Sequence, residues 1–163
     1  MAVERQLQLL VLGSGDARYE AQLARLTTDS VLQGRVCFLQ GFSPELANKI
    51  FAAGDFFVVP SRYEPCGLTD FIAQLFGNIP IVHHVGGLVK VLDNVTGLAY
   101  SGPFPDDLFN GLHRALELYG DKQRLRQMQL RAVQEIERYY TWDKVMYKYL
   151  DLYRKARKTQ LCM

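Results

Sequence analysis

Cysteine is scarce and scattered in this chain. Its 163 residues include 3 cysteines, Cys37, Cys66 and Cys162, which are far apart and odd in number. That spacing fits neither a disulfide framework nor a CxxC metal site. We therefore expect a protein of a reducing, intracellular type of compartment, with no disulfide and no resident metal.

Long apolar runs are also missing. No stretch of 18 consecutive apolar residues occurs, so we expect no membrane span and no membrane partner. The first residues do not combine a charged segment, an apolar segment and a small-residue cleavage site, so we expect no secretory signal. The composition, 48% hydrophobic and 22% charged, is that of one soluble domain with an ample core.

Charge is unevenly distributed along the chain, although the net charge is only +2. Residues 1–119 contain 8 Lys and Arg against 12 Asp and Glu, whereas residues 120–163 contain 11 against 5. A few spaced basic residues rarely form a nucleic-acid site, so we interpret them as the solvated faces of terminal helices. The aromatic residues among them recur at helical spacing, which is typical of packing rather than base stacking. We expect no nucleic-acid partner.

Apolar runs of strand type alternate with helical patterns. Beyond residue 105 the pattern is wholly helical, and Thr141 is placed to cap a last helix. The alternation predicts an α/β fold, a Rossmann-like parallel sheet with helices on both faces, followed by C-terminal helices. Ligands of such sheets bind at the carboxyl ends of the strands. The predicted strands are 7–12, 35–40, 55–59, 79–83 and 98–100, and the glycine-containing loops at 13–15, 67 and 86–87 fall at such ends.

The most informative segment is residues 61–68, directly after the strand predicted at 55–59. It brings the carboxylate of Glu64 together with the backbone amides of Cys66, Gly67 and Leu68, where a helix begins. Free amides at a helix start attract anions. A carboxylate beside them would repel a bare phosphate but accept hydrogen bonds from sugar hydroxyls. The pairing predicts a site for a sugar phosphate or sugar nucleotide.

Other candidate sites have plainer interpretations. The Gly13-Ser14-Gly15 turn lacks the third glycine of a dinucleotide fingerprint, because Arg18 stands there, so we interpret it as a tight turn. Cys66 follows a proline and has no neighbouring histidine, so we expect it to contribute its backbone amide rather than a nucleophilic thiol. We interpret His83 and His84, at a strand end, as structural hydrogen-bond donors.

Residues 54–69, together with 77–82 and 86–88, resemble bacterial glycogen synthases and plant starch synthases. The resemblance runs from about residue 7 to about residue 157 and includes Tyr140-Thr141-Trp142. That family has the GT-B architecture of two facing Rossmann-like domains. The resemblance implies a C-terminal, donor-binding domain over residues 1–140, incomplete at its N-terminal side, and a helix over 141–163 that packs towards the missing domain. It also implies a cytoplasmic location, or a plastid location in a plant.

The resemblance carries over to individual site residues. It implies that Glu64 is the catalytic-site glutamate that contacts glucose hydroxyls, joined by the amides of Cys66, Gly67 and Leu68. Donor contacts are also implied for Thr69 at the diphosphate, Phe42 as an aromatic that stacks on adenine, and Asp70, which stands where Gln or Asn is usual.

Three positions depart from patterns found among related retaining transferases. Ile72 stands where many of them have a second glutamate, which favours the glycogen and starch synthase branch over sucrose-phosphate and trehalose-phosphate synthases. His83 and His84 stand where Arg-Arg pairs are common, which removes fixed positive charge.

The reaction implied by the resemblance is transfer of glucose from ADP-glucose to the non-reducing end of an α-1,4-glucan, with retention and without a cofactor. The Arg and Lys that neutralise the leaving diphosphate in the family, and its acceptor domain, are outside this sequence, so we expect the chain alone to be inactive. Two alternatives stay open, a non-catalytic module that docks a partner through its basic helices, and a relative that uses UDP-glucose. Apolar residues on two faces of the last helix also suggest self-association.

Overall fold

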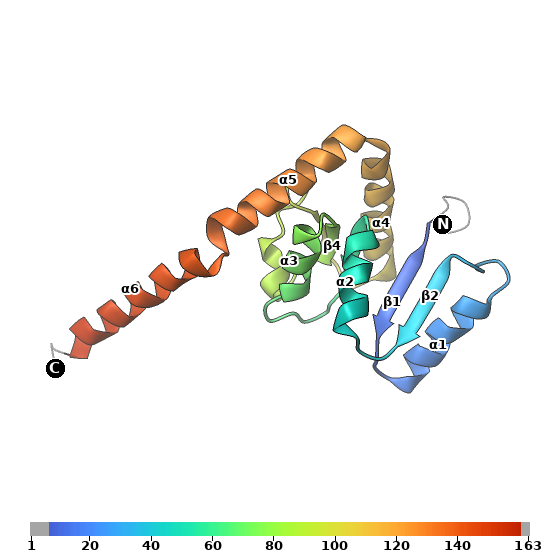
Figure 1. The fold of residues 1–163 in the computed structure, drawn as a ribbon, viewed down its shortest axis with the longest axis horizontal. Coiled ribbons are helices and arrows are strands. Elements are labelled where there is room, and N and C mark those ends of the chain that lie inside the picture. Colours follow the sequence, from blue (N-terminus) through green and yellow to red (C-terminus); the bar gives the residue numbers. More distant parts are fainter. Residues whose placement is uncertain (1–6, 161–163) are drawn as a thin grey trace. The chain divides into compact units, whose positions relative to one another are not determined.

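Strands and helices alternate as the sequence predicts, and each of the five predicted strands is present within two residues of its predicted bounds. The computed structural model describes residues 7–160, with side chains to residue 157, so Cys162 lies outside the described residues. Figure 1 shows the elements in chain order. They are β1 (Leu9–Gly13), α1 (Ala17–Thr28), β2 (Val36–Gln40), α2 (Pro44–Ala53), β3 (Phe56–Val59), α3 (Leu68–Leu75), β4 (Ile79–His83), the 3-10 helix η1 (Gly86–Lys90), β5 (Leu98–Tyr100), α4 (Pro105–Gly120), α5 (Lys122–Tyr139) and α6 (Trp142–Gln160).

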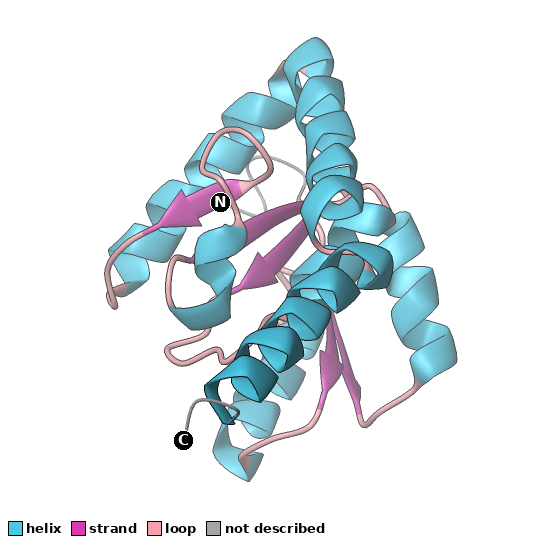
Figure 2. Cartoon of the chain, turned by 90° about the vertical axis from the view of Figure 1, so that its left-hand side faces the viewer, coloured by secondary structure: helices cyan, strands magenta, loops and turns pink. Residues whose placement is uncertain are grey.

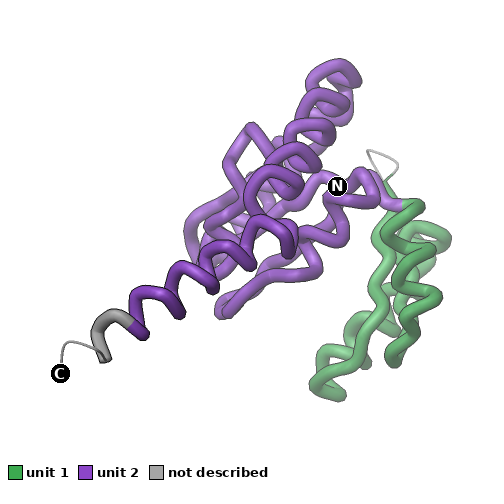
Figure 3. The backbone as a smooth tube through the Cα atoms, turned by 60° about the vertical axis from the view of Figure 1, so that its left-hand side comes forward, with its two compact units in different colours: residues 1–53 green, residues 54–163 purple. Residues whose placement is uncertain are grey.

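The chain forms two compact units, Met1–Ala53 and Gly54–Met163 (Figure 3). In the first, β1 pairs in parallel with β2, and Val11 lies opposite Phe38. In the second, β3, β4 and β5 form a parallel sheet with β4 in the middle. Both sheets are parallel, as predicted, and helices flank the strands (Figure 2). The domain division at residue 140 stays a prediction.

Local signals set the helix starts of the first unit. The Asp16 carboxylate caps α1 by accepting the amide of Arg18 at 2.8 Å. Ser43 does the same for α2, where its hydroxyl accepts the amide of Leu46 at 3.3 Å and Pro44 occupies the first helical position.

The sheet of the second unit is buried on both faces. Side chains alternate along β4, so Ile79 and Ile81 point to one face while Val82 points to the other. The first face packs against α4 and α5, and the second packs against η1. Buried side chains on the first face are Ile79, Ile81, Leu98, Ala115, Leu118, Leu125 and Met128, and those on the second are Val59, Val82, Leu88 and Val91. This core fixes the positions of the loops that follow β3 and β4.

The last helix, α6, has no buried side chain among its described residues. Trp142, Tyr147 and Tyr153 are each about two thirds exposed or more, at 72%, 67% and 66%. Among the described residues, α5 is the element that makes substantial contact with α6, so the aromatic residues of α6 are left largely uncovered. Their predicted role in packing, towards a missing domain or a second copy, stays a prediction. Within residues 7–160, the helices are all too short or too polar to cross a lipid bilayer.

Candidate functional site

The loop between β3 and α3 holds Glu64 at the carboxyl edge of the sheet. Gly67 ends this loop in the left-handed conformation, with φ of 72°, and α3 begins at the next residue. The Glu64 side chain is half-buried, and its two oxygens have separate donors. Oε1 accepts the amide of Gly67 at 3.0 Å, and Oε2 accepts the hydroxyl of Ser61 at 3.3 Å. The carboxylate is thus held within its own loop, outside the hydrophobic core.

The amides at the start of α3 differ in their availability. The Gly67 amide is buried and donates to Glu64, so in this structure it is occupied. The amides of Cys66, Leu68 and Thr69 have no hydrogen-bond acceptor among residues 7–160. All three residues are exposed. Contact of these four residues and Glu64 with a donor stays a prediction, and the geometry offers a carboxylate with three open amides beside it.

A second loop packs directly on the first. The Gly87 amide donates to the carbonyl of Glu64 at 2.7 Å. A Cβ atom added at Gly86 would clash with the carbonyl oxygen of Glu64, and one added at Gly87 would clash with the carbonyl of Cys66. The two glycines that follow β4 therefore allow the backbones of the two loops to touch, and this contact supports the Glu64 loop from behind.

A buried ion pair lies under the start of α3. Lys90, the last residue of η1, has its Nζ 3.1 Å from Oδ1 of Asp70, and the Asp70 side chain is fully buried. The ammonium also donates to the carbonyls of Cys66, at 2.5 Å, and Gly67. Burial raises the pKa of Asp70 above its ordinary value, and the Lys90 cation acts in the opposite direction.

The partners of Asp70 are all inside the protein. Besides Lys90, the Gln74 amide donates to the Asp70 carbonyl at 3.2 Å and approaches its carboxylate at 3.4 Å. The predicted donor contact of Asp70 stays a prediction, but its side chain faces away from solvent. Sequence reasoning missed Lys90 altogether. The available signal was Asp70 itself, since an acid at a position that usually has an amide requires a cationic partner once it is buried.

The two histidines at the end of β4 donate to backbone carbonyls, as predicted. Nδ1 of His83 lies 2.8 Å from the carbonyl of Ser61, and the ring stacks on Tyr100 with centroids 5.4 Å apart. Nε2 of His84 lies 3.2 Å from the carbonyl of Val89. A carbonyl only accepts, so these nitrogens carry the proton. His83 thereby ties the end of β4 to the start of the Glu64 loop.

The first unit contributes the other predicted contact. Phe42 follows β2 and is 90% exposed, so its ring is accessible for stacking, and the contact with adenine stays a prediction.

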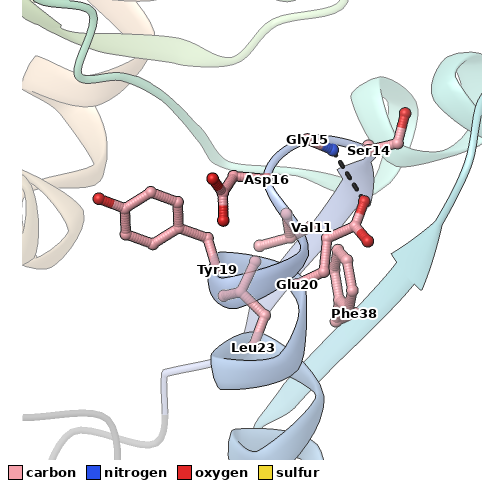
Figure 4. A pocket seen from close by; sticks show the side chains of 9 residues that line it. Val11, Ser14, Gly15, Asp16, Tyr19, Glu20, Leu23 and Phe38 are labelled. Atoms are coloured by element: carbon pink, nitrogen blue, oxygen red, sulfur yellow. Dashed lines mark hydrogen bonds between the residues drawn. The ribbon is translucent and has the colours of Figure 1, made fainter.

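The same unit has a pocket of about 230 Å³ beside the Gly13-Ser14-Gly15 turn (Figure 4). Glu20 accepts the Gly15 amide there at 2.8 Å. Since carboxylates occupy amides that a phosphate would need, the turn behaves as the tight turn that was predicted. The pocket is lined by Val11, Gly13, Ser14, Gly15, Asp16, Tyr19, Glu20, Leu23 and Phe38.

Within the described residues, no group of three or more His, Cys, Asp or Glu side chains is arranged to hold a metal ion. The features that remain are a parallel α/β sheet, a carboxylate at its carboxyl edge and open amides at a helix start. Together they define a domain of the class that binds sugar phosphates or nucleotides at the ends of parallel strands.

The sequence agrees with one family of that class. Residues 1–118 match the family described as "Glycosyl transferases group 1". This chain belongs to the group 1 glycosyl transferases, which confirms the enzyme class that the sequence predicts.

Among curated proteins, the relatives of this chain include glycogen synthases. The chain is 37% identical over 159 residues to a glycogen synthase of Geotalea daltonii, covering 91% of this chain and 31% of that protein. It is 32% identical over 162 residues to a glycogen synthase of Vibrio atlanticus, covering 94% of this chain and 32% of that protein. The chain thus spans about a third of the length of the curated relatives it matches.

Solved structures agree in fold. The catalytic domain of starch synthase IV from Arabidopsis thaliana, bound to ADP and acarbose, has a TM-score of 0.70 at 20% identity and is matched over 92% of this chain and 38% of that one. A sucrose-phosphate synthase from Thermosynechococcus elongatus has a TM-score of 0.73 at 26% identity, over 97% and 41%. Anabaena HepE, in complex with UDP-glucose, has a TM-score of 0.65 at 21% identity, over 83% and 39%. The predicted α/β class of GT-B glycosyltransferases is confirmed.

Proposed function

We propose that this chain is the donor-binding part of a glucosyltransferase that transfers glucose from ADP-glucose to the non-reducing end of an α-1,4-glucan with retention. The observation that carries the proposal is the half-buried Glu64 carboxylate beside the open amides of Cys66, Leu68 and Thr69. Relatives named glycogen synthase, and a similar fold in a starch synthase bound to ADP, support this choice of reaction.

The separate roles proposed for Glu64 and for the open amides follow from how many hydrogen bonds each group can make. An ionised carboxylate has about four acceptor positions, and Glu64 uses two of them, for Gly67 and Ser61. The others are available to glucose hydroxyls without loss of the Gly67 bond. The open amides of Leu68 and Thr69 would then receive the diphosphate, whose developing charge is the main electrostatic demand of the transfer. In this arrangement the Gly67 amide orients Glu64.

Isothermal titration calorimetry with ADP-glucose and ADP tests the donor site. Glu64→Gln keeps the shape of the side chain but removes its charge, so we expect affinity for ADP-glucose to fall about 10-fold to 100-fold, or about 1.4 to 2.8 kcal/mol. Affinity for ADP should change little, because ADP has no glucose. Addition of EDTA should leave both affinities unchanged, since we propose that no metal takes part.

Glu117→Gln is the matched control, because Glu117 is an exposed glutamate on α4 whose ion-pair partner in the described part of the chain is His113. It should bind both ligands as the unmodified protein does. Absence of ADP-glucose binding at millimolar concentration, or equal binding by the Glu64→Gln protein, would contradict the proposal.

UDP-glucose is the alternative donor, favoured by the similar fold of HepE, which was solved with UDP-glucose. The exposed ring of Phe42 is accessible for stacking, but every nucleobase offers a face to such a ring, so it does not decide between the two donors. Competition between ADP-glucose and UDP-glucose in the same titration distinguishes the two. The non-catalytic docking module is less well supported, because the relatives found are transferases.

A further inference from the structure

Lys90 contacts four residues around the turn that starts α3. Its ammonium donates to the carbonyls of Cys66 and Gly67, forms the ion pair with Asp70, and lies 4.2 Å from the centroid of the Phe71 ring. Lys90 itself comes from η1, after the next strand of the sheet. Its side chain is only 11% exposed. One cation therefore joins two loops at the edge where Glu64 stands.

The contacts described for the ammonium are all with groups of the protein. It donates hydrogen bonds to two carbonyls and faces the Asp70 carboxylate as an ion pair, although Asp70 Oδ1 accepts no hydrogen bond within the described residues. The contacts of Lys90 are those of a group that fixes the backbone of its own protein.

Fixing a carbonyl also fixes an amide. A trans peptide unit is planar, and its N–H points opposite to its C=O. The carbonyl of Cys66 shares a peptide plane with the amide of Gly67, and the carbonyl of Gly67 shares one with the amide of Leu68. Because Lys90 holds both carbonyls on the inner side of the turn, both amides point away from it. The first reaches Glu64 Oε1 at 3.0 Å, and the second is among the open amides of the site.

Asp70 stabilises the buried Lys90 ammonium at the start of α3. The N-terminus of a helix carries partial positive charge, which disfavours a buried ammonium. Asp70, the third residue of α3, supplies the opposite charge at 3.1 Å. The pair is closely covered by Gly67, where an added Cβ would lie 2.8 Å from Asp70 Oδ1 and 3.0 Å from Lys90 Nζ.

We propose that Lys90 and Asp70 are positioning residues of the donor site, in which the ammonium holds the carbonyls of Cys66 and Gly67 so that the Gly67 amide orients Glu64 and the Leu68 amide faces the diphosphate. This rests on the proposed function for the identity of the ligand. The placement of the two amides is a property of the chain itself and can be measured without any ligand.

The decisive variant is the double substitution Lys90→Met with Asp70→Asn. Methionine keeps an unbranched stem over Phe71 but donates no hydrogen bond, and asparagine keeps the shape of Asp70. Replacing both charges avoids an unpaired buried ion, so the fold should be retained. We expect circular dichroism to be unchanged, while affinities for ADP and ADP-glucose both fall about 10-fold, because both ligands carry the diphosphate. Glu64→Gln, in contrast, should affect ADP-glucose alone.

The ligand-free measurement is the amide ¹H–¹⁵N spectrum. A proton donated to a carboxylate resonates downfield, and we expect the Gly67 signal to shift upfield in both the double variant and Glu64→Gln. The control is Arg114→Met with Asp93→Asn, which removes another ion pair whose arginine also holds a carbonyl, that of Ala99 at 2.9 Å. It should leave the Gly67 signal and both affinities unchanged.

The outcomes separate the two proposals. Unchanged affinities and an unchanged Gly67 signal in the folded double variant would overturn the positioning role, even if the unmodified protein binds ADP-glucose. If the unmodified protein binds no donor but the Gly67 signal shifts as expected, Lys90 positions the turn and the proposed ligand is wrong. A loss of thermal stability with full affinity would reduce the pair to a structural role and would overturn the inference.

Discussion

At the scale of single residues, the site depends on groups whose partners lie elsewhere in the chain. Glu64 was identified from its neighbours in sequence, because a carboxylate next to a helix start is a local pattern. Its bond to Gly67, and the use of Lys90 beneath the turn, were not predicted. The first depends on the side-chain conformation of Glu64 within its own loop. The second joins Lys90 to the carbonyl of Cys66, which is 24 residues earlier in the chain. The acid at position 70 indicates that a cationic partner is needed, but no local pattern identifies Lys90 as that partner.

Asp70 gives a pH-dependent prediction at this scale. Its pKa is raised above 3.8 mainly by burial, so the folded state favours the protonated acid more than the unfolded state does. The stabilisation from this group is complete below the ordinary pKa and is lost as pH rises through the higher folded value. We expect the unfolding free energy of the unmodified protein, relative to Asp70→Asn, to decline as pH rises above about 4.

Denaturant unfolding of both proteins at a series of pH values provides the measurement. Other titrating groups are common to the two proteins and cancel in the difference. A difference that stays constant with pH, or that grows in favour of the unmodified protein as pH rises, would show that the pairing with Lys90 outweighs burial.

At the scale of elements, the five strands and the loops at their ends were predictable. Short apolar runs bounded by glycine and proline are strong local signals, and the parallel sheet buries them on both faces. The last helix was predicted less well. Periodicity identifies the apolar residues of a helix but not the element that covers them, so α6 was correctly placed in sequence while the partner of its aromatic residues stays a prediction.

The contact of η1 with the Glu64 loop gives the prediction at this scale. Gly87→Ala would push a methyl group into the carbonyl of Cys66, so the loops must separate. We expect the variant to lose about 1 to 3 kcal/mol of stability, as overpacked sites do, and to bind ADP-glucose more weakly. Thermal unfolding and calorimetry measure the two effects.

Gly120→Ala is a suitable control for this substitution. Gly120 ends α4, and a Cβ atom there would meet nothing within 4 Å. Wild-type stability of the Gly87→Ala protein would mean that the two loops are not in the close contact described above.

At the scale of the whole molecule, the chain spans about a third of the length of its glycogen synthase relatives. The fold was predictable because strands and helices alternate along the chain up to residue 100, and the family because residues 54–69, 77–82 and 86–88 carry the resemblance. An acceptor site was not predictable, because the residues of the proposed donor site do not encode one.

The corresponding prediction concerns turnover. We expect the 163-residue chain to bind ADP-glucose but not to extend glycogen, because in our proposal the α-glucan and the charge-neutralising cations belong to segments beyond this sequence. Incorporation of radiolabelled glucose into glycogen is the measurement, with a full-length glycogen synthase as the positive control. Robust incorporation by the chain alone would show that it holds its own acceptor site.

The open amides at the start of α3 limit how this protein could be redesigned. They are main-chain groups, so replacing a side chain does not remove them, and their affinity for an anion would persist through most substitutions at the surface. In our proposal, laboratory evolution towards a different sugar would therefore have to act on the side chain beside these amides, and selection should return substitutions at Glu64.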